Sequence, residues 1–177
     1  MVSNATSPVS FYSAAVLGPW RGFMNDMRAL DAKEEARRLQ AEGAFEEALP
    51  LMLISVDLRE QSHTLCLSLS ELAELYLDMC EYDQAETTTQ RMLEEAWRYD
   101  SQQQERIAKE ILQDIARKRL TGLAHGSSVK ISCHDLPELF GEPGVLRGRV
   151  RGRNAYYIDV GDERYVLSRR CFEKADA

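Results

Sequence analysis

One pattern of small and large residues occurs twice in this sequence, and it constrains the fold more than any other feature. Residues 36–48 and 73–85 each carry a small residue, a large residue, a turn residue, an aromatic residue and an alanine at matching steps. The matching pairs are Ala36 and Ala73, Leu39 and Tyr76, Gly43 and Cys80, Phe45 and Tyr82, and Ala48 and Ala85. Small residues let two helices approach closely, and Gly43 suits a turn because glycine adopts a left-handed backbone at little cost. The pattern therefore predicts two antiparallel helical hairpins.

This pattern resembles the tetratricopeptide repeat, a helix–turn–helix unit of about 34 residues. The resemblance covers roughly residues 31–99, although Cys80 replaces the usual turn glycine. The two copies are 37 residues apart, so we expect a longer connection around residues 59–63. Ala108 repeats the small position in a further predicted helix at 101–120, which would cap the stack. A plain α-helical hairpin bundle is the alternative interpretation.

The composition changes near residues 121–128, where helix formers give way to strand formers. Thirteen basic and twenty-one acidic residues precede residue 126, and nine basic and eight acidic residues follow it, so the net charges are −8 and +1. Short segments separated by turn residues predict strands at 129–132, 145–151, 155–160 and 163–168. We therefore expect an acidic helical part followed by a small β part.

The β part resembles an SH3-like barrel module over about residues 129–173. The resemblance lies in the segments 136–145, 155–160 and 165–172, although Phe140 stands where asparagine is usual. It implies a small antiparallel barrel, close to the lower size limit for a domain that folds alone. The predicted class is α+β, with tetratricopeptide-like helical hairpins before the barrel. The expected divisions are a tail at 1–24 that is uncharged apart from Arg21, a helical domain at 25–122, a linker at 123–128 and the barrel at 129–177.

No motif in the sequence predicts catalysis, a cofactor or a metal. Cys133, His134 and Asp135 include a nucleophile, a base and an acid, but adjacent residues on a strand point to opposite sides. The cysteines form no C-x-x-C pair, and no glycine-rich phosphate loop is present. The longest strongly apolar stretch, 49–56, is too short to span a membrane. We therefore expect a non-enzyme without catalytic residues, metal ligands, cofactors or a membrane span.

The tetratricopeptide resemblance implies a concave groove that binds a segment of another protein. Glu71, one of its implied lining residues, would repel a C-terminal carboxylate, so capture of chaperone tails is not expected. The groove residues expected to contact a partner are Lys33, Arg37, Glu74, Arg106 and Lys109.

Alternating arginines predict a basic face on the second strand of the barrel. Arg147, Arg149 and Arg151 share one side of an extended strand. This face could contact solvent, the acidic helices of the same chain, an acidic protein surface or a nucleic acid, although a net charge of −7 opposes the approach of nucleic acid.

We expect a non-catalytic adaptor, scaffold or assembly subunit that binds another protein or peptide within a larger complex. The expected location is the cytoplasm, with the cytoskeleton or the cilium as narrower alternatives. The alternative function is a nucleic-acid-associated factor that uses the arginine-rich hairpin.

Overall fold

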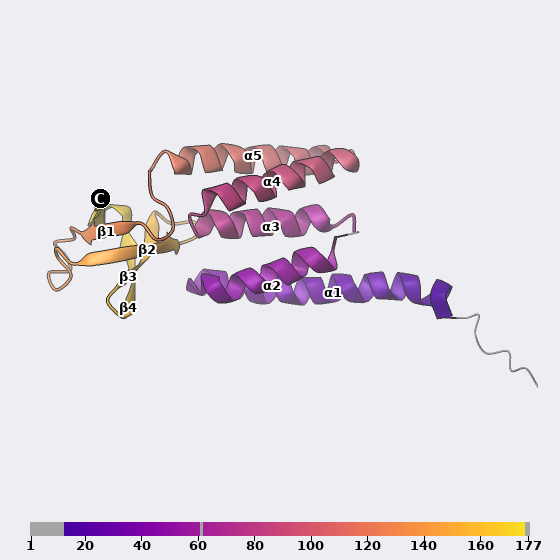
Figure 1. Cartoon of the computed structure of the whole chain (residues 1–177), viewed down its shortest axis with the longest axis horizontal. Coiled ribbons are helices and arrows are strands. Elements are labelled where there is room, and N and C mark those ends of the chain that lie inside the picture. The colour runs from indigo at the N-terminus through magenta and orange to yellow at the C-terminus, as the bar shows by residue number, and fades with distance from the viewer. Residues whose placement is uncertain (1–12, 61, 176–177) are drawn as a thin grey trace, which may run out of the picture.

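The structure is a computed structural model, and it describes residues 13–60 and 62–175 (Figure 1). These residues form five helices followed by a five-stranded antiparallel sheet, an α+β layout. No helix in the described ranges is both long and apolar enough to cross a bilayer. The helices are α1 (Ser13–Glu42), α2 (Phe45–Leu58), α3 (Leu65–Asp78), α4 (Tyr82–Arg98) and α5 (Gln102–Arg119).

The helices form two antiparallel hairpins and a final helix, and the same backbone turn ends α1, α3 and α4. α1 packs on α2, α3 packs on α4, and α5 packs on α4 and more lightly on α3. Gly43, Cys80 and Asp100 have left-handed φ values of 77°, 62° and 50°. The next N–H donates to a carbonyl five residues back in each case: Ala44 to Leu39, Glu81 to Tyr76 and Ser101 to Ala96, each over 2.9 Å. The turn predicted at Gly43 is therefore present and recurs along the stack.

The small positions of the repeated pattern are where the helices meet. Their side chains are completely buried and belong to one apolar core, together with Phe45 and Met52 of α2. Their size lets neighbouring helices approach, while larger residues fill the space beside them. The buried alanines are Ala36, Ala48, Ala73, Ala85 and Ala108.

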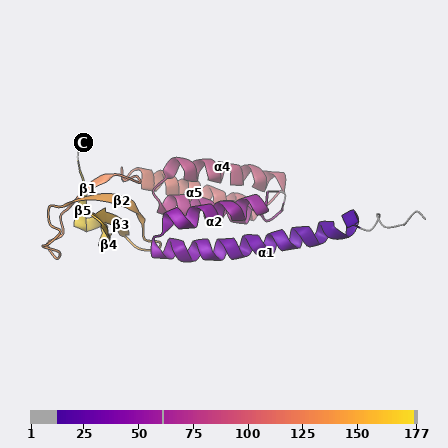
Figure 2. The same ribbon diagram turned by 60° about the horizontal axis from the view of Figure 1, so that its bottom comes forward.

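The first helix is longer than the sequence indicated. α1 begins at Ser13, inside the segment 1–24 that we expected to be a tail, and it continues beyond the ends of the other helices (Figures 1 and 2). The lack of charge suggested a tail, but uncharged residues such as alanine, leucine and methionine are good helix formers. The rest of the expected tail, residues 1–12, lies outside the described residues.

The β part is an open sheet with strand order β4-β3-β2-β1-β5. The expected closed barrel is not present, because β4 and β5 lie at opposite edges and closure requires the two edges to pair. A 3-10 turn at Arg169–Cys171 precedes the last strand, which we had not predicted as a separate element. The strands are β1 (Ser128–Ile131), β2 (Pro143–Arg149), β3 (Ala155–Val160), β4 (Glu163–Ser168) and β5 (Phe172–Lys174).

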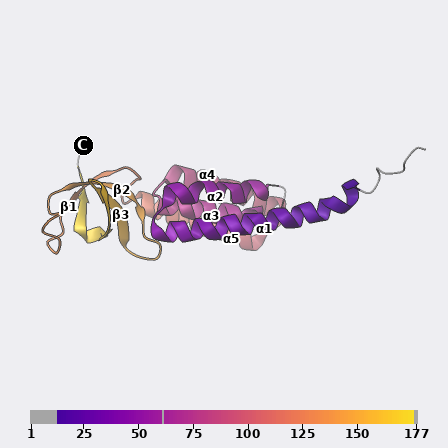
Figure 3. The ribbon, with the colours of Figure 1, turned by 90° about the horizontal axis from the view of Figure 1, so that it is seen from below.

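The sheet lies at one end of the helices, opposite the free end of α1 (Figure 3). The segment 123–128, which we expected to be a linker, packs against the sheet. Leu123 is completely buried in the core of the sheet, and the Gly126 N–H donates to the Leu146 carbonyl over 2.8 Å. His125 Nδ1 lies 2.8 Å from the Arg147 carbonyl oxygen. The His125 N–H also donates to the Cys80 carbonyl at the end of α3 over 3.4 Å, so this segment links the sheet to the helical part.

Candidate functional site: a cleft between the helices and the sheet

Two glycines allow the sheet to approach the helices closely. A Cβ atom on Gly148 of β2 would lie 2.4 Å from a ring carbon of Phe45 and 2.7 Å from the carbonyl oxygen of Asp78. A Cβ atom on Gly43 would lie 2.6 Å from the ring of Tyr157 on β3. Tyr157 packs edge-to-face on Phe45, with ring centroids 5.6 Å apart, and donates its hydroxyl to the Ala41 carbonyl over 3.1 Å. This contact fixes β2 beside the end of α3.

A cleft opens next to this contact, between α3, α5 and the turn after β2. Its volume is about 320 Å³, which is at the small end of the range for ligand sites. Leu77, Ile107 and Ile111 supply apolar surface, and charged side chains of both signs surround it. The charged lining residues are Glu74, Asp78, Glu110, Asp114, Lys118, Arg149 and Arg151.

Two acidic side chains of the cleft, Asp78 and Glu74, come from α3. Burial raises the pKa of Asp78, although the Gln40 amide donates to its carboxylate over 2.7 Å and opposes this shift. Burial also raises the pKa of Glu74, which forms an ion pair with Arg151. Both carboxylates therefore bear a desolvation cost that a basic group of a ligand could reduce.

The groove residues predicted from the sequence divide between the cleft and the helix surfaces. Glu74 lines the cleft. Arg37 pairs with Glu71 of α3, Arg106 lies 3.8 Å from Glu110, and Lys109 lies 2.5 Å from Glu105. Lys33 is half-buried on α1. The structure thus brings Glu74 together with the sheet and leaves the other four away from the cleft lining.

The three arginines of the predicted basic face have three different surroundings. Arg147 pairs with Asp159 over 2.6 Å, and Arg164 pairs with the same carboxylate over 2.8 Å. The hydrogen bond from Arg164 contributes most, and that from Arg147 contributes less, to holding the pKa of Asp159 below its usual range. Arg151 lies beyond the end of β2 and pairs with Glu74. Arg149 lines the cleft and has no ion pair among the described residues.

A bulge interrupts the alternation of β2 between Leu146 and Gly148. Leu146 lies opposite Ile158 and is buried in the core of the sheet, whereas Gly148 lies opposite Tyr157 and faces Phe45 of the helical part. Simple alternation therefore does not place Arg147 and Arg149 on one face of the strand. Leu146 is fully buried, whereas Val145 and Val150 are half-buried. The strand ends at Arg149, so its alternation does not extend to Arg151.

The lining of the cleft contains no serine, cysteine or histidine that could act as a nucleophile or a base beside its carboxylates. Elsewhere, His134 is exposed and stacks on Phe140 with ring centroids 4.9 Å apart, while Cys133 is buried. Within the described part of the chain, no three potential ligands are grouped for a metal ion. The geometry of the cleft suits non-covalent binding through apolar contact and paired charges.

Sequence reasoning missed most of the α5 side of the cleft. Ile107, Ile111, Asp114 and Lys118 follow one another at steps of three or four, so they share a face of the predicted helix. That spacing was a usable signal for the face, but no local pattern indicated that the sheet would lie beside it.

Comparisons with known proteins returned no family model, no curated protein and no solved structure with a significant match to this chain.

Proposed function

We propose that this protein is a non-catalytic adaptor or assembly subunit that binds a segment of another protein in the cleft. The cleft itself is the observation that carries the proposal. Apolar side chains of α3 and α5 lie within a rim of four acidic and three basic residues. A peptide that inserts one apolar side chain and places charges of both signs beside it would satisfy this surface.

The ion pairs of the basic hairpin favour a protein partner over a nucleic acid. Arg147 is paired with Asp159, and Arg151 is paired with Glu74. Nucleic-acid affinity depends on many basic groups that are available to phosphates. Arg149 has no carboxylate partner within residues 13–60 and 62–175, but it shares the cleft with Asp78 and other carboxylates, which would repel a phosphate.

We further propose that the helical part is tetratricopeptide-like and that the sheet is an incompletely closed SH3-like module. Three helix ends with the same left-handed turn support the first proposal. A meander of four strands with a fifth strand returning beside the first supports the second. The setting we propose is a larger cytoplasmic complex, including cytoskeletal or ciliary ones.

A photocrosslinking experiment tests the proposed binding site. A photoreactive residue at Ile107, which is half-buried in the cleft, should capture a specific protein, whereas one at Lys130 on β1 should not. The binding of the captured protein is then measured for wild type, Arg149→Ala and the control Lys130→Ala. Both variants remove one basic side chain of the sheet, but only Arg149 lines the cleft.

We expect Arg149→Ala to weaken the captured complex by about tenfold, as loss of a well-placed charged contact does, and Lys130→Ala to leave it unchanged. An equal loss of affinity in Arg149→Ala and Lys130→Ala would show that net charge, and not the cleft, controls binding. Submicromolar RNA or DNA binding that falls steeply with salt and requires Arg149 would instead support the nucleic-acid alternative.

A further inference from the structure

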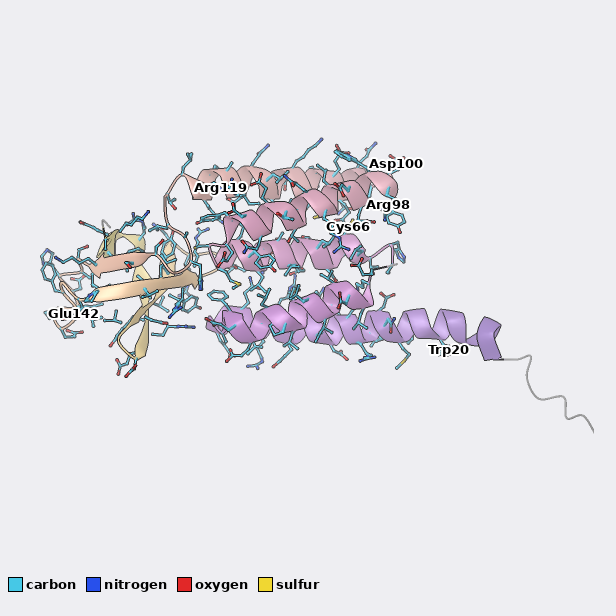
Figure 4. The ribbon with its side chains drawn as sticks, in the orientation of Figure 1. Trp20, Cys66, Arg98, Asp100, Arg119 and Glu142 are labelled. Atoms are coloured by element: carbon cyan, nitrogen blue, oxygen red, sulfur yellow. The ribbon has the colours of Figure 1, made fainter. Side chains whose placement is uncertain are left out.

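The part of α1 that extends beyond the other helices carries a stripe of large apolar side chains. Figure 4 labels Trp20 on this part of the helix. Trp20, Phe23, Met24 and Met27 are 64%, 56%, 54% and 43% exposed, and the rings of Trp20 and Phe23 meet edge-to-face. Their spacing of three and four residues places them on one side of the helix. We call these four residues the α1 stripe.

The α1 stripe faces away from the rest of the molecule. Ala29 and Ala36 are completely buried, so they mark the side of α1 that packs on the bundle. At about 100° per residue, the α1 stripe lies roughly half a turn round the helix from these alanines. The remaining described helices therefore cannot cover it without a large rearrangement.

The exposed area of the α1 stripe approaches that of a specific interface. Side chains of this size bury about 150–250 Å² each, so the exposed fractions leave roughly 330–540 Å² of surface per chain. Two such stripes would bury roughly 650–1,100 Å², which is below the range of about 1,200–2,000 Å² for stable protein interfaces and corresponds to a weak dimer.

We propose that the α1 stripe binds the α1 stripe of a second copy of this chain, with the two helices antiparallel. A twofold pairing matches each apolar stripe with an identical one, as in most homodimers. The two bundles then lie at opposite ends of the paired helices, so neither blocks the approach of the other. The interface is separate from the cleft and does not depend on its proposed partner.

Charge on α1 selects the antiparallel direction. Asp31, Glu34 and Glu35 are exposed and continue the side of the α1 stripe toward the bundle, where Glu35 pairs with Arg38 over 2.6 Å. Asp31 and Glu34 form no ion pair among the described residues. A parallel pair would place these acids against their own copies, which is unfavourable. An antiparallel pair places them beside the partner's residues before Trp20, and residues 1–20 contain no charged side chain.

The molecular mass of the full chain in solution tests whether two copies associate. Trp20 is the residue under test, and Trp97 is its matched control. Trp20 and Trp97 are similarly exposed, at 64% and 59%, but Trp97 lies on α4. By light scattering and sedimentation at about 10–100 µM, we expect wild type and Trp97→Ala to have twice the 20.2 kDa of one chain. Trp20→Ala should weaken the dimer at least about tenfold, because buried tryptophans are among the side chains that dominate interface affinity. Circular dichroism confirms that each variant remains helical.

A spin label at position 34 tests the direction of the pair. Glu34→Cys can be labelled selectively because the four native cysteines are buried. With a rise of 1.5 Å per residue, an antiparallel pair centred on the α1 stripe separates the two labels by about 30–40 Å, and a parallel pair by less than about 20 Å.

A wild type that stays monomeric at 100 µM would overturn the proposal, as would a dimer that Trp20→Ala leaves intact or a label separation below about 20 Å. A monomer that binds lipid vesicles through Trp20 would also overturn it, because the α1 stripe would then fit a membrane surface.

Discussion

Replacing Gly148 with alanine should loosen the contact between the sheet and the helices. The added methyl group would lie 2.4 Å from a ring carbon of Phe45 and 2.7 Å from the Asp78 carbonyl oxygen. The Phe45 side chain cannot rotate freely away, because it is 1% exposed and packs against Tyr157. The carbonyl belongs to the last turn of α3. The strand must therefore move away from the helices.

The size of this effect follows from two opposing contributions. Overpacking by one methyl group costs about 1–3 kcal/mol. Replacing glycine by alanine stiffens the unfolded chain and returns about 0.4–1 kcal/mol. We expect a net loss of about 1–2 kcal/mol in the free energy of unfolding, which corresponds to a fall in Tm of about 2–8 °C for a chain of this length.

Urea and thermal unfolding of the full chain, followed by circular dichroism, measure this loss. Gly22→Ala is the matched control, because Gly22 lies in α1 and an added Cβ would meet no atom within 4 Å. Alanine is the better helix former, so the control should be about 0.5–1 kcal/mol more stable than wild type. A Gly148→Ala protein as stable as wild type would show that the sheet does not rest on Phe45 and α3 as described.

Three further substitutions test individual contacts. Burial raises the pKa of Asp78 above its ordinary value of 3.8, so wild-type stability falls as pH rises through the folded-state value. In urea unfolding at pH 7, Asp78→Asn should therefore be at least as stable as wild type. The advantage should disappear below about pH 4, where Asp78 is protonated in both the folded and the unfolded wild type. An advantage that grows on acidification would contradict this. Tyr157→Phe removes the hydrogen bond to Ala41 and should lower the free energy of unfolding by about 0.5–1.5 kcal/mol at neutral pH. Arg151→Ala removes a partly exposed ion pair with Glu74 and should shift Tm by less than about 2 °C in a thermal scan.

The parts of the fold that local patterns determine could be predicted from the sequence. The expected strands at 155–160 and 163–168 coincide with β3 and β4, because alternating side chains and the turn at Gly161 define both ends. The helix expected at 101–120 is α5, within one residue at each end. Glu74, Arg149 and Arg151 were also among the predicted binding residues, and all three line the cleft.

Features that depend on contacts between distant segments could not be predicted in this way. The cleft exists because Gly148 lets β2 approach Phe45 and the end of α3, and no spacing within the sequence reports that contact. The separate strand β5 is three residues long, which is too short to show an alternating pattern. The helical character of α1 from Ser13 was hidden because we interpreted the absence of charge as a tail.

Cys80 limits how freely the two parts of this protein could be exchanged by recombination. Its backbone ends α3 in the left-handed conformation, while its side chain is 2% exposed within the core of the sheet. Burial raises the pKa of its thiol to about 11, so it remains a neutral core residue. A gene fusion that joined this sheet to unrelated helices would remove one of the side chains that fill the core. Transfer of the sheet without the α3–α4 turn would therefore leave this position of its core unfilled.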